Sequence, residues 1–167
     1  MHIAFLTSEY PHPKVSHAAG IATSIKNLAV ALVDKGEQVT IFVYHQNEDT
    51  IIDDQGVTIH LIKKKKYKVF TWYFYRKQLQ YYINKVVKSE AVDLIEAPDW
   101  TGITAFMKFN IPLVIRLHGS DAYFCKLDKR KQKFKNFLFE KMGLLKASAY
   151  IAPTTFAGEE TAKIFGL

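Results

Sequence analysis

The feature that most constrains the fold of this chain is a regular alternation of short apolar runs and longer amphipathic segments. Six runs rich in apolar and β-branched residues predict strands over residues 2–7, 38–44, 57–62, 93–96, 113–117 and 149–152. Apolar residues at helical spacing predict helices over residues 21–33, 79–87, 101–109, 129–146 and 155–165. The predicted buried side of the helix over residues 129–146 consists of Phe134, Phe137, Leu138, Met142 and Leu145. Strands that alternate with helices are typical of an α/β fold, so we expect a doubly wound, mostly parallel sheet with helices on both faces.

The chain length fits one domain. A chain of 167 residues with 49% hydrophobic residues can bury a sizeable core, and no repeat or low-complexity linker divides it. Cys125 is the single cysteine, which excludes an internal disulfide and favours a reducing compartment. No apolar run approaches the roughly 20 residues of a membrane span. The first residues also lack the basic region and cleavage site of a signal peptide, so we expect a soluble cytoplasmic protein.

Sheets of this kind bind ligands at the carboxyl ends of their strands, which directs attention to three loops. The loop after the first strand contains Ala19 and Gly20 and leads into a helix. Small residues let the backbone approach a ligand, and the free N–H groups of a helix start favour an anion. The alternative is that Gly20 only supplies a turn. Neither a GxGxxG fingerprint nor a GxxxxGK[ST] loop occurs.

The loops after the fourth and fifth strands carry polar side chains. Glu96, Asp99 and Trp100 follow the fourth strand, where carboxylates can accept hydrogen bonds from hydroxyls and an indole can stack on a sugar ring. The alternative is a proline turn in which Asp99 caps the next helix and Trp100 joins the core. His118 ends the fifth strand, close to Asp121, and its imidazole can donate to a hydroxyl or a phosphate. No metal-ligand cluster or nucleophile motif is present, so we expect no metal site.

The positive charge is concentrated in one segment. The chain has 23 basic and 16 acidic residues, and nine of the basic residues fall between Lys63 and Lys88 with no acid among them. The candidates for contact with an anionic membrane surface are Lys63, Lys64, Lys65, Lys66, Lys68 and Trp72. The same composition suits single-stranded nucleic acid, but no nucleic-acid motif accompanies it, which argues against such a partner. A third reading is a solvated loop followed by aromatic residues that pack a helix onto the sheet.

Several features fall in one order along the chain: the opening HIAFLTSEYP…AAGIATSIKNLAVALVDKGEQVTIFV, the strand ends EAPDW and RLHGSD, and the closing YIAPTTFAGEETAKIFGL. Together they resemble the N-terminal half of a retaining glycosyltransferase with the GT-B fold, of the large family four (group 1). The resemblance implies a single Rossmann-like domain over residues 1–167 that holds the acceptor. It also implies that the C-terminal, donor-binding domain is absent from this chain, because nothing matches its Glu-x7-Glu motif.

The resemblance assigns roles to the loop residues. Ala19 and Gly20 would approach the donor diphosphate, although the family often has two glycines there. His118 would contact the transferred sugar, and Glu96, Asp99, Trp100 and Asp121 are acceptor-side candidates. The implied reaction is hexosyl transfer from a nucleoside diphosphate sugar to a hydroxyl of a glycan or lipid-linked acceptor in polysaccharide biosynthesis. We expect retention of configuration, no metal or other cofactor, and little activity of this chain alone. The alternative is a basic α/β module that binds membrane or nucleic acid.

Overall fold

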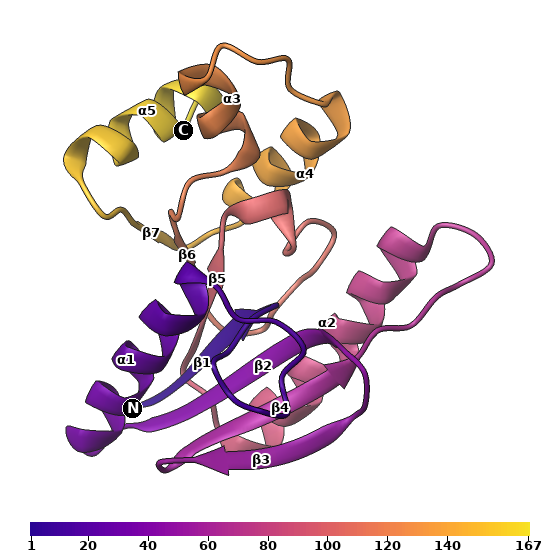
Figure 1. Cartoon of the computed structure of the whole chain (residues 1–167), viewed down its shortest axis with the longest axis vertical. Helices are drawn as coiled ribbons and strands as arrows, with labels where there is room; N and C mark the ends of the chain where they lie inside the picture. Colours follow the sequence, from indigo (N-terminus) through magenta and orange to yellow (C-terminus); the bar gives the residue numbers. More distant parts are fainter.

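A computed structural model describes all residues from Met1 to Leu167. Seven strands form one sheet in the order β3-β4-β2-β1-β5-β6-β7 (Figure 1). The strands are β1 (His2–Thr7), β2 (Gln38–Gln46), β3 (Thr50–Asp54), β4 (Val57–Lys63), β5 (Leu94–Pro98), β6 (Leu113–Arg116) and β7 (Ala149–Ile151). All neighbours pair in parallel except β3, which runs antiparallel to β4 at one edge. The expected doubly wound, mostly parallel sheet is therefore confirmed.

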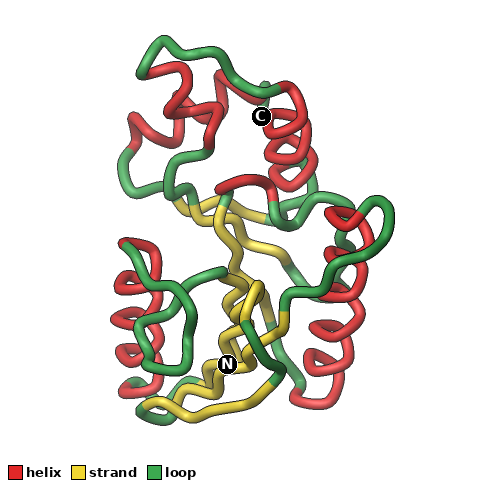
Figure 2. Tube along the Cα trace, turned by 45° about the vertical axis from the view of Figure 1, so that its right-hand side comes forward, coloured by secondary structure: helices red, strands yellow, loops and turns green.

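Two hydrophobic cores lie on opposite faces of the sheet. Successive side chains of a strand point to opposite faces, and β1 divides accordingly: Leu6 belongs to the core beneath α2, whereas Phe5 belongs to the core beneath α1. Figure 2 shows these two long helices on either side of the strands. Continuous apolar runs, rather than alternating ones, are what a strand covered on both faces requires.

The helices are α1 (Gly20–Asp34), α2 (Thr71–Glu90), α3 (Asp121–Leu127), α4 (Phe134–Leu144) and α5 (Thr155–Phe165), together with the short 3₁₀ turn η1 (Trp100–Gly102). In Figure 1, α3, α4 and α5 group together at one end of the molecule, away from α1 and α2. Two elements were missing from the sequence prediction, namely the edge strand β3 and the helix α3. The Ser120 hydroxyl accepts a hydrogen bond from the Tyr123 N–H at 3.1 Å, so a serine N-cap begins α3.

The helix predicted over residues 101–109 is wrong. Only η1 forms, and Thr101 and Phe106 adopt left-handed backbone angles of φ 54° and 64°. Side chains from α2 instead satisfy carbonyls of this segment: Arg76 donates to Ile103 at 3.1 Å, and Lys77 donates to Phe106 at 2.6 Å. The apolar spacing of this segment was therefore real, but cations from a distant helix satisfy its backbone.

The helix predicted over residues 129–146 forms only from Phe134 to Leu144, and its buried side was misassigned. Phe134, predicted to be buried, is 77% exposed, and Leu145 is 60% exposed. Phe139 and Glu140 are buried instead. The reason is a close approach between backbones: a Cβ added to Gly102 would lie 2.2 Å from the carbonyl carbon of Phe139. Because η1 packs directly on α4, the side chains around residue 139 face the interior.

Candidate functional site

The strand order reverses between β1 and β5, which makes their carboxyl ends the switch point of the sheet. Both strands pair with each other in parallel, and β6 lies beside β5. The loops that follow β1, β5 and β6 therefore meet at one edge, where open α/β sheets bind ligands. These are the three loops that the sequence singled out.

The buried carboxylate of Asp99 connects two of these loops. Its Oδ1 accepts a hydrogen bond from the His118 N–H at 3.0 Å, while its Oδ2 is buried without a partner. Burial raises the pKa of Asp99 to about 6, against hydrogen bonds from neighbouring backbone N–H groups that lower it. Asp99 is 2% exposed, so it holds the backbone of His118 in place and does not itself face the solvent.

His118 is half-buried and lines a cavity of about 270 Å³ together with Gly119, Tyr123, Phe124 and Thr154. Burial and the charge of Arg116 lower the pKa of His118. The imidazole is therefore neutral near pH 7 and can both donate and accept a hydrogen bond. Gly119, with φ 101°, lets the chain turn sharply after it.

Glu96 forms a bidentate ion pair with Arg116 across neighbouring strands. Its two oxygens lie 2.6 and 3.0 Å from the guanidinium nitrogens. Glu96 is only 7% exposed, so the pair lies at the strand ends beneath the loops. A pair of this geometry is among the strongest charge-assisted contacts and fixes the relative position of β5 and β6.

Glu140 is a buried acid next to the candidate site that the sequence did not indicate. Its carboxylate is fully buried and accepts hydrogen bonds from the N–H groups of Thr101 (3.3 Å), Asp121 (2.8 Å) and Ala122 (3.2 Å). Burial raises its pKa to about 7. Glu140 thus joins η1 and the start of α3 to α4. No local signal marks it, because the three backbone N–H groups from which it accepts hydrogen bonds lie 18 or more residues away.

The turn before α1 is open on its outer side. Gly20 is exposed, a Cβ there would meet nothing within 4 Å, and α1 has no side-chain cap or acidic residue in its first turn. The Ala19 N–H donates to Glu9 Oε2 at 3.0 Å. Glu9 was not among the sequence candidates. It bridges the turn and the neighbourhood of His118, since its charge acts to raise the pKa of that imidazole.

Trp100 and Asp121 occupy different environments. Trp100 is 41% exposed and packs edge-to-face on Phe124, with ring centroids 6.4 Å apart. Asp121 is held inside the α3–α4 region, where its Oδ2 accepts a hydrogen bond from the Asn136 amide at 3.1 Å. Of the four acceptor-side candidates, Trp100 alone is exposed.

The basic segment forms the end of β4, the following loop and the first turns of α2. The five lysines Lys63, Lys64, Lys65, Lys66 and Lys68 are all exposed. Trp72, predicted to share this surface, is partly buried and packs on Phe106 and Phe139, with ring centroids 5.3 and 5.0 Å away. Val69 and Phe70 are instead the apolar side chains that project next to the lysines, at 63% and 62% exposure.

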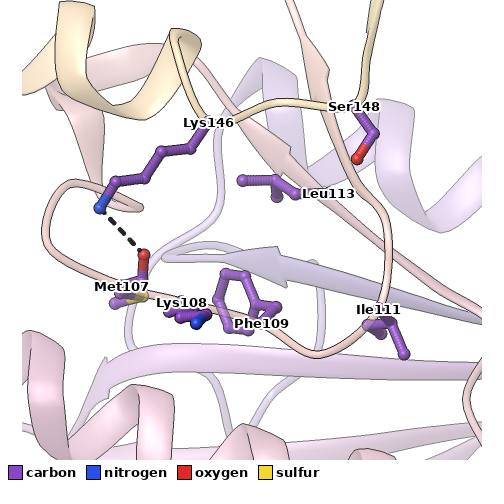
Figure 3. A pocket seen from close by; sticks show the side chains of 7 residues that line it. All are labelled: Met107, Lys108, Phe109, Ile111, Leu113, Lys146 and Ser148. Atoms are coloured by element: carbon purple, nitrogen blue, oxygen red, sulfur yellow. Dashed lines mark hydrogen bonds between the residues drawn. The ribbon is translucent and has the colours of Figure 1, made fainter.

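A further cavity lies away from the candidate site. A cavity of about 380 Å³ between Phe109, Leu113 and Lys146 lies where β6 begins, at the opposite edge from the site (Figure 3). Lys146 closes one side of it by donating to the Met107 carbonyl at 3.2 Å.

None of the helices combines the length and apolar character that crossing a bilayer demands.

The chain matches the family model of Glycosyltransferase Family 4 over residues 18–167. The chain belongs to glycosyltransferase family 4. No curated protein sequence matches it. Among solved structures, it resembles the catalytic domain of starch synthase IV from Arabidopsis thaliana bound to ADP and acarbose, with a TM-score of 0.59 at 12% identity. The likeness covers 99% of this chain and 50% of that one, so the chain spans about half the length of the solved structure.

These comparisons confirm the family resemblance and the Rossmann-like fold of one half of a GT-B glycosyltransferase. In this family 4 chain, the structure brings Asp99, His118 and Trp100 to one edge with the Gly20 turn, as the strand-end argument predicts. The roles of these residues, the missing second domain and the reaction stay predictions.

Proposed function

We propose that this chain is the acceptor-side domain of a metal-independent, retaining glycosyltransferase. The complete enzyme transfers a sugar from a nucleoside diphosphate sugar to a hydroxyl of a glycan or lipid-linked acceptor. The observation that carries the proposal is the pairing, at one switch point, of a neutral half-buried His118 with an open, uncapped helix start at Gly20. The chain spans about half the length of the solved catalytic domain that it resembles, so we expect these 167 residues alone to transfer sugar poorly or not at all.

The chemistry follows from the charges that develop in the transition state. Negative charge grows on the leaving diphosphate, and the N–H groups at the start of α1 stabilise it in fixed orientation. The His118 imidazole donates a hydrogen bond to a hydroxyl of the transferred sugar. Two buried acids position the loop that carries His118. Asp99 accepts a hydrogen bond from the His118 N–H, and Glu140 accepts one from the Asp121 N–H.

The test is sugar transfer by the complete enzyme with a panel of nucleoside diphosphate sugars. The anomeric configuration of the product is read by NMR, and EDTA is present throughout. We expect His118→Ala to lower kcat by about 100-fold, the scale of losing one preorganised hydrogen-bond donor. His12→Ala is the matched control, since His12 bonds within its own loop through the Lys14 N–H at 3.2 Å. Equal activities of the two variants, an inverted product or loss of activity in EDTA would contradict the proposal.

We also propose that the exposed loop between β4 and α2 places the domain on the cytoplasmic face of an anionic membrane. Lys66 and Lys68 alternate with the exposed side chains of Tyr67, Val69 and Phe70, so charge and apolar area project together. Each basic residue near an anionic surface contributes about 1 kcal/mol.

Cosedimentation with vesicles of phosphatidylglycerol and phosphatidylcholine tests this docking. Val69→Ser/Phe70→Ser is expected to weaken binding several-fold, and raised salt to weaken it further. The control variant replaces Lys129, Lys131 and Lys133, a second exposed basic stretch outside the β4–α2 loop, by alanine. If both variants lost vesicle binding equally, the binding would reflect only general attraction between basic residues and anionic lipid. The proposed docking surface would then be wrong.

A further inference from the structure

A cavity of about 330 Å³ lies between the ends of β2 and β4, the first turns of α2 and η1. Its lining includes Ser8, His45, Lys64, Lys65, Arg76 and Trp100. Trp100 separates it from the cavity of His118, because its ring packs on Phe124, which lines that second cavity. The cavity therefore opens next to the reaction centre, on the side of the β4–α2 loop.

The cations of this cavity have no counter-charge in the protein. No carboxylate lies within 4.0 Å of Lys64, Lys65 or Arg76. Arg76 is instead fixed by backbone carbonyls, with hydrogen bonds of 2.9 Å to Trp72 and 3.1 Å to Ile103. A cation removed from water costs free energy unless an anion compensates it. This cost falls on Arg76, which is partly buried, whereas Lys64 and Lys65 are exposed and add two further positive charges to the lining of the same cavity. The three charges together indicate an anionic ligand.

The acids on the neighbouring loops do not supply that compensation. Glu9 accepts a hydrogen bond from the Ala19 N–H at 3.0 Å, and Asp49 accepts one from the Lys63 N–H at 2.8 Å. α2 begins at Thr71 in the wall of the cavity without a side-chain cap, so its positive dipole end adds to the field of the lysines.

The backbone at His45 is arranged around the same cavity. His45 adopts φ 64°, a left-handed conformation that is strained for a residue with a Cβ, and it lies where the β2–β4 register shifts. The His45 ring stacks on the Tyr75 ring, with centroids 5.0 Å apart. The backbone N–H of His45 donates a hydrogen bond to the Tyr75 hydroxyl at 2.9 Å. The bulge thereby turns the imidazole into the cavity wall. Such strain persists where the surrounding structure holds it, and it gathers at binding sites.

We infer that this cavity binds a phosphoryl group of the acceptor, held by Lys64, Lys65 and the charge of Arg76. A phosphoryl group carries up to two negative charges and three acceptor oxygens, which suits three cations better than the single charge of a carboxylate does. This inference rests on the proposed function, since it names the acceptor class of the same site. A phosphorylated sugar and a lipid-linked diphosphate share the recognised chemistry.

The test is titration calorimetry on the chain Met1–Leu167 at constant ionic strength. The probes are inorganic pyrophosphate, glucose 6-phosphate, geranyl diphosphate, glucuronate and glucose. We expect saturable binding of the phosphoryl compounds and at least tenfold weaker binding by Lys64→Ala/Lys65→Ala. Lys66→Ala/Lys68→Ala is the matched control, because it removes the same charge from the same loop outside the cavity lining, and it should stay within twofold of the wild type.

Each outcome decides the inference. No saturable binding, equal losses in both lysine pairs, or glucuronate binding as tight as the phosphates would overturn it. Tighter binding of geranyl diphosphate than of pyrophosphate assigns the phosphoryl group to a lipid-linked acceptor, and the reverse order assigns it to a soluble one. The titration needs no donor and no transfer. Its failure therefore leaves the proposed transferase untested, whereas phosphate binding by a complete enzyme that transfers no sugar refutes the transferase alone.

Discussion

Gly102 provides the sharpest quantitative test of how the site is held together. Gly102 has φ 55°, and an added Cβ would lie 2.2 Å from the Phe139 carbonyl carbon and oxygen, and 2.5 Å from the Glu140 nitrogen. Gly166 is a matched comparison, because it has a similar φ of 68° but an added Cβ meets nothing within 4 Å. Gly102→Ala and Gly166→Ala therefore share the backbone strain, and only Gly102→Ala forces α4 to move.

The expected losses follow from these two contributions. The left-handed conformation costs an alanine about 1 kcal/mol, which we expect as the whole effect of Gly166→Ala. Overpacking against a backbone adds about 1–3 kcal/mol, so Gly102→Ala should lose about 3 kcal/mol in total. For a chain of this length, each kcal/mol lowers Tm by about 2–4 °C. The difference between the variants should therefore be several degrees.

Urea unfolding followed by circular dichroism measures both losses, provided that the slope m is unchanged. Movement of α4 would also withdraw Glu140 from the N–H groups of Asp121 and Ala122. The amide NMR signals of these two residues should therefore shift in Gly102→Ala and stay in place in Gly166→Ala. If the two variants were equally stable, the tight packing of η1 on α4 would not exist, and our account of the buried Glu140 would be wrong.

Further variants test the other assignments. Asp99 has a raised pKa of about 6, so it contributes stability that is full below its ordinary value of 3.8 and is lost as the pH rises through 6. Urea unfolding from pH 4 to pH 7 should show the wild type losing about 2 kcal/mol more than Asp99→Asn over that range; parallel curves would refute the buried acid. Phe139→Ala should cost about 3–5 kcal/mol and Phe134→Ala under about 0.5 kcal/mol in the same assay, and the reverse order would restore the predicted helix face. Arg76→Met should cost about 2–4 kcal/mol, because carbonyls lose a charged donor, and hydrogen exchange should then speed up around η1; unchanged exchange would show that Arg76 does not hold this loop.

The sequence predicts well wherever the signal is local. Apolar runs flanked by turn residues located six of the strands. Five of them lie inside the sheet, where a strand covered on both faces must be largely apolar, and the sixth, β7, is an exposed edge strand that is also apolar. Strand ends then located His118, Trp100 and the Gly20 turn at one edge, since parallel strands share their direction. Edge strand β3 was not predicted, because its sequence, TIIDD, contains as many polar as apolar positions within one residue. It pairs with a single strand, β4, so it need not be apolar.

The prediction failed where distant segments decide the structure. Residues 101–109 carry helical spacing, yet Arg76 and Lys77 take their carbonyls. The buried side of α4 depends on Gly102, whose approach no periodicity within α4 can reveal. Glu140 looks like a surface residue of an amphipathic helix until the start of α3 is placed against it. These contacts arise from the packing of whole elements, so a linear pattern does not contain them.

The single cysteine gives this arrangement a built-in reporter. Cys125 lies on α3 with 3% exposure, and its Sγ lies 3.7 Å from Asp121 Oδ1. Burial and the charge of Asp121 raise the pKa of the thiol, so little reactive thiolate forms in the folded chain. An alkylating reagent can therefore modify the protein quickly only after the packing around α3 opens, including the loop between α3 and α4, whose Lys131 carbonyl lies 4.0 Å from this sulfur. The labelling rate of this single thiol therefore reports how often the region around α3, next to His118, opens. No cysteine has to be engineered into the protein for the measurement.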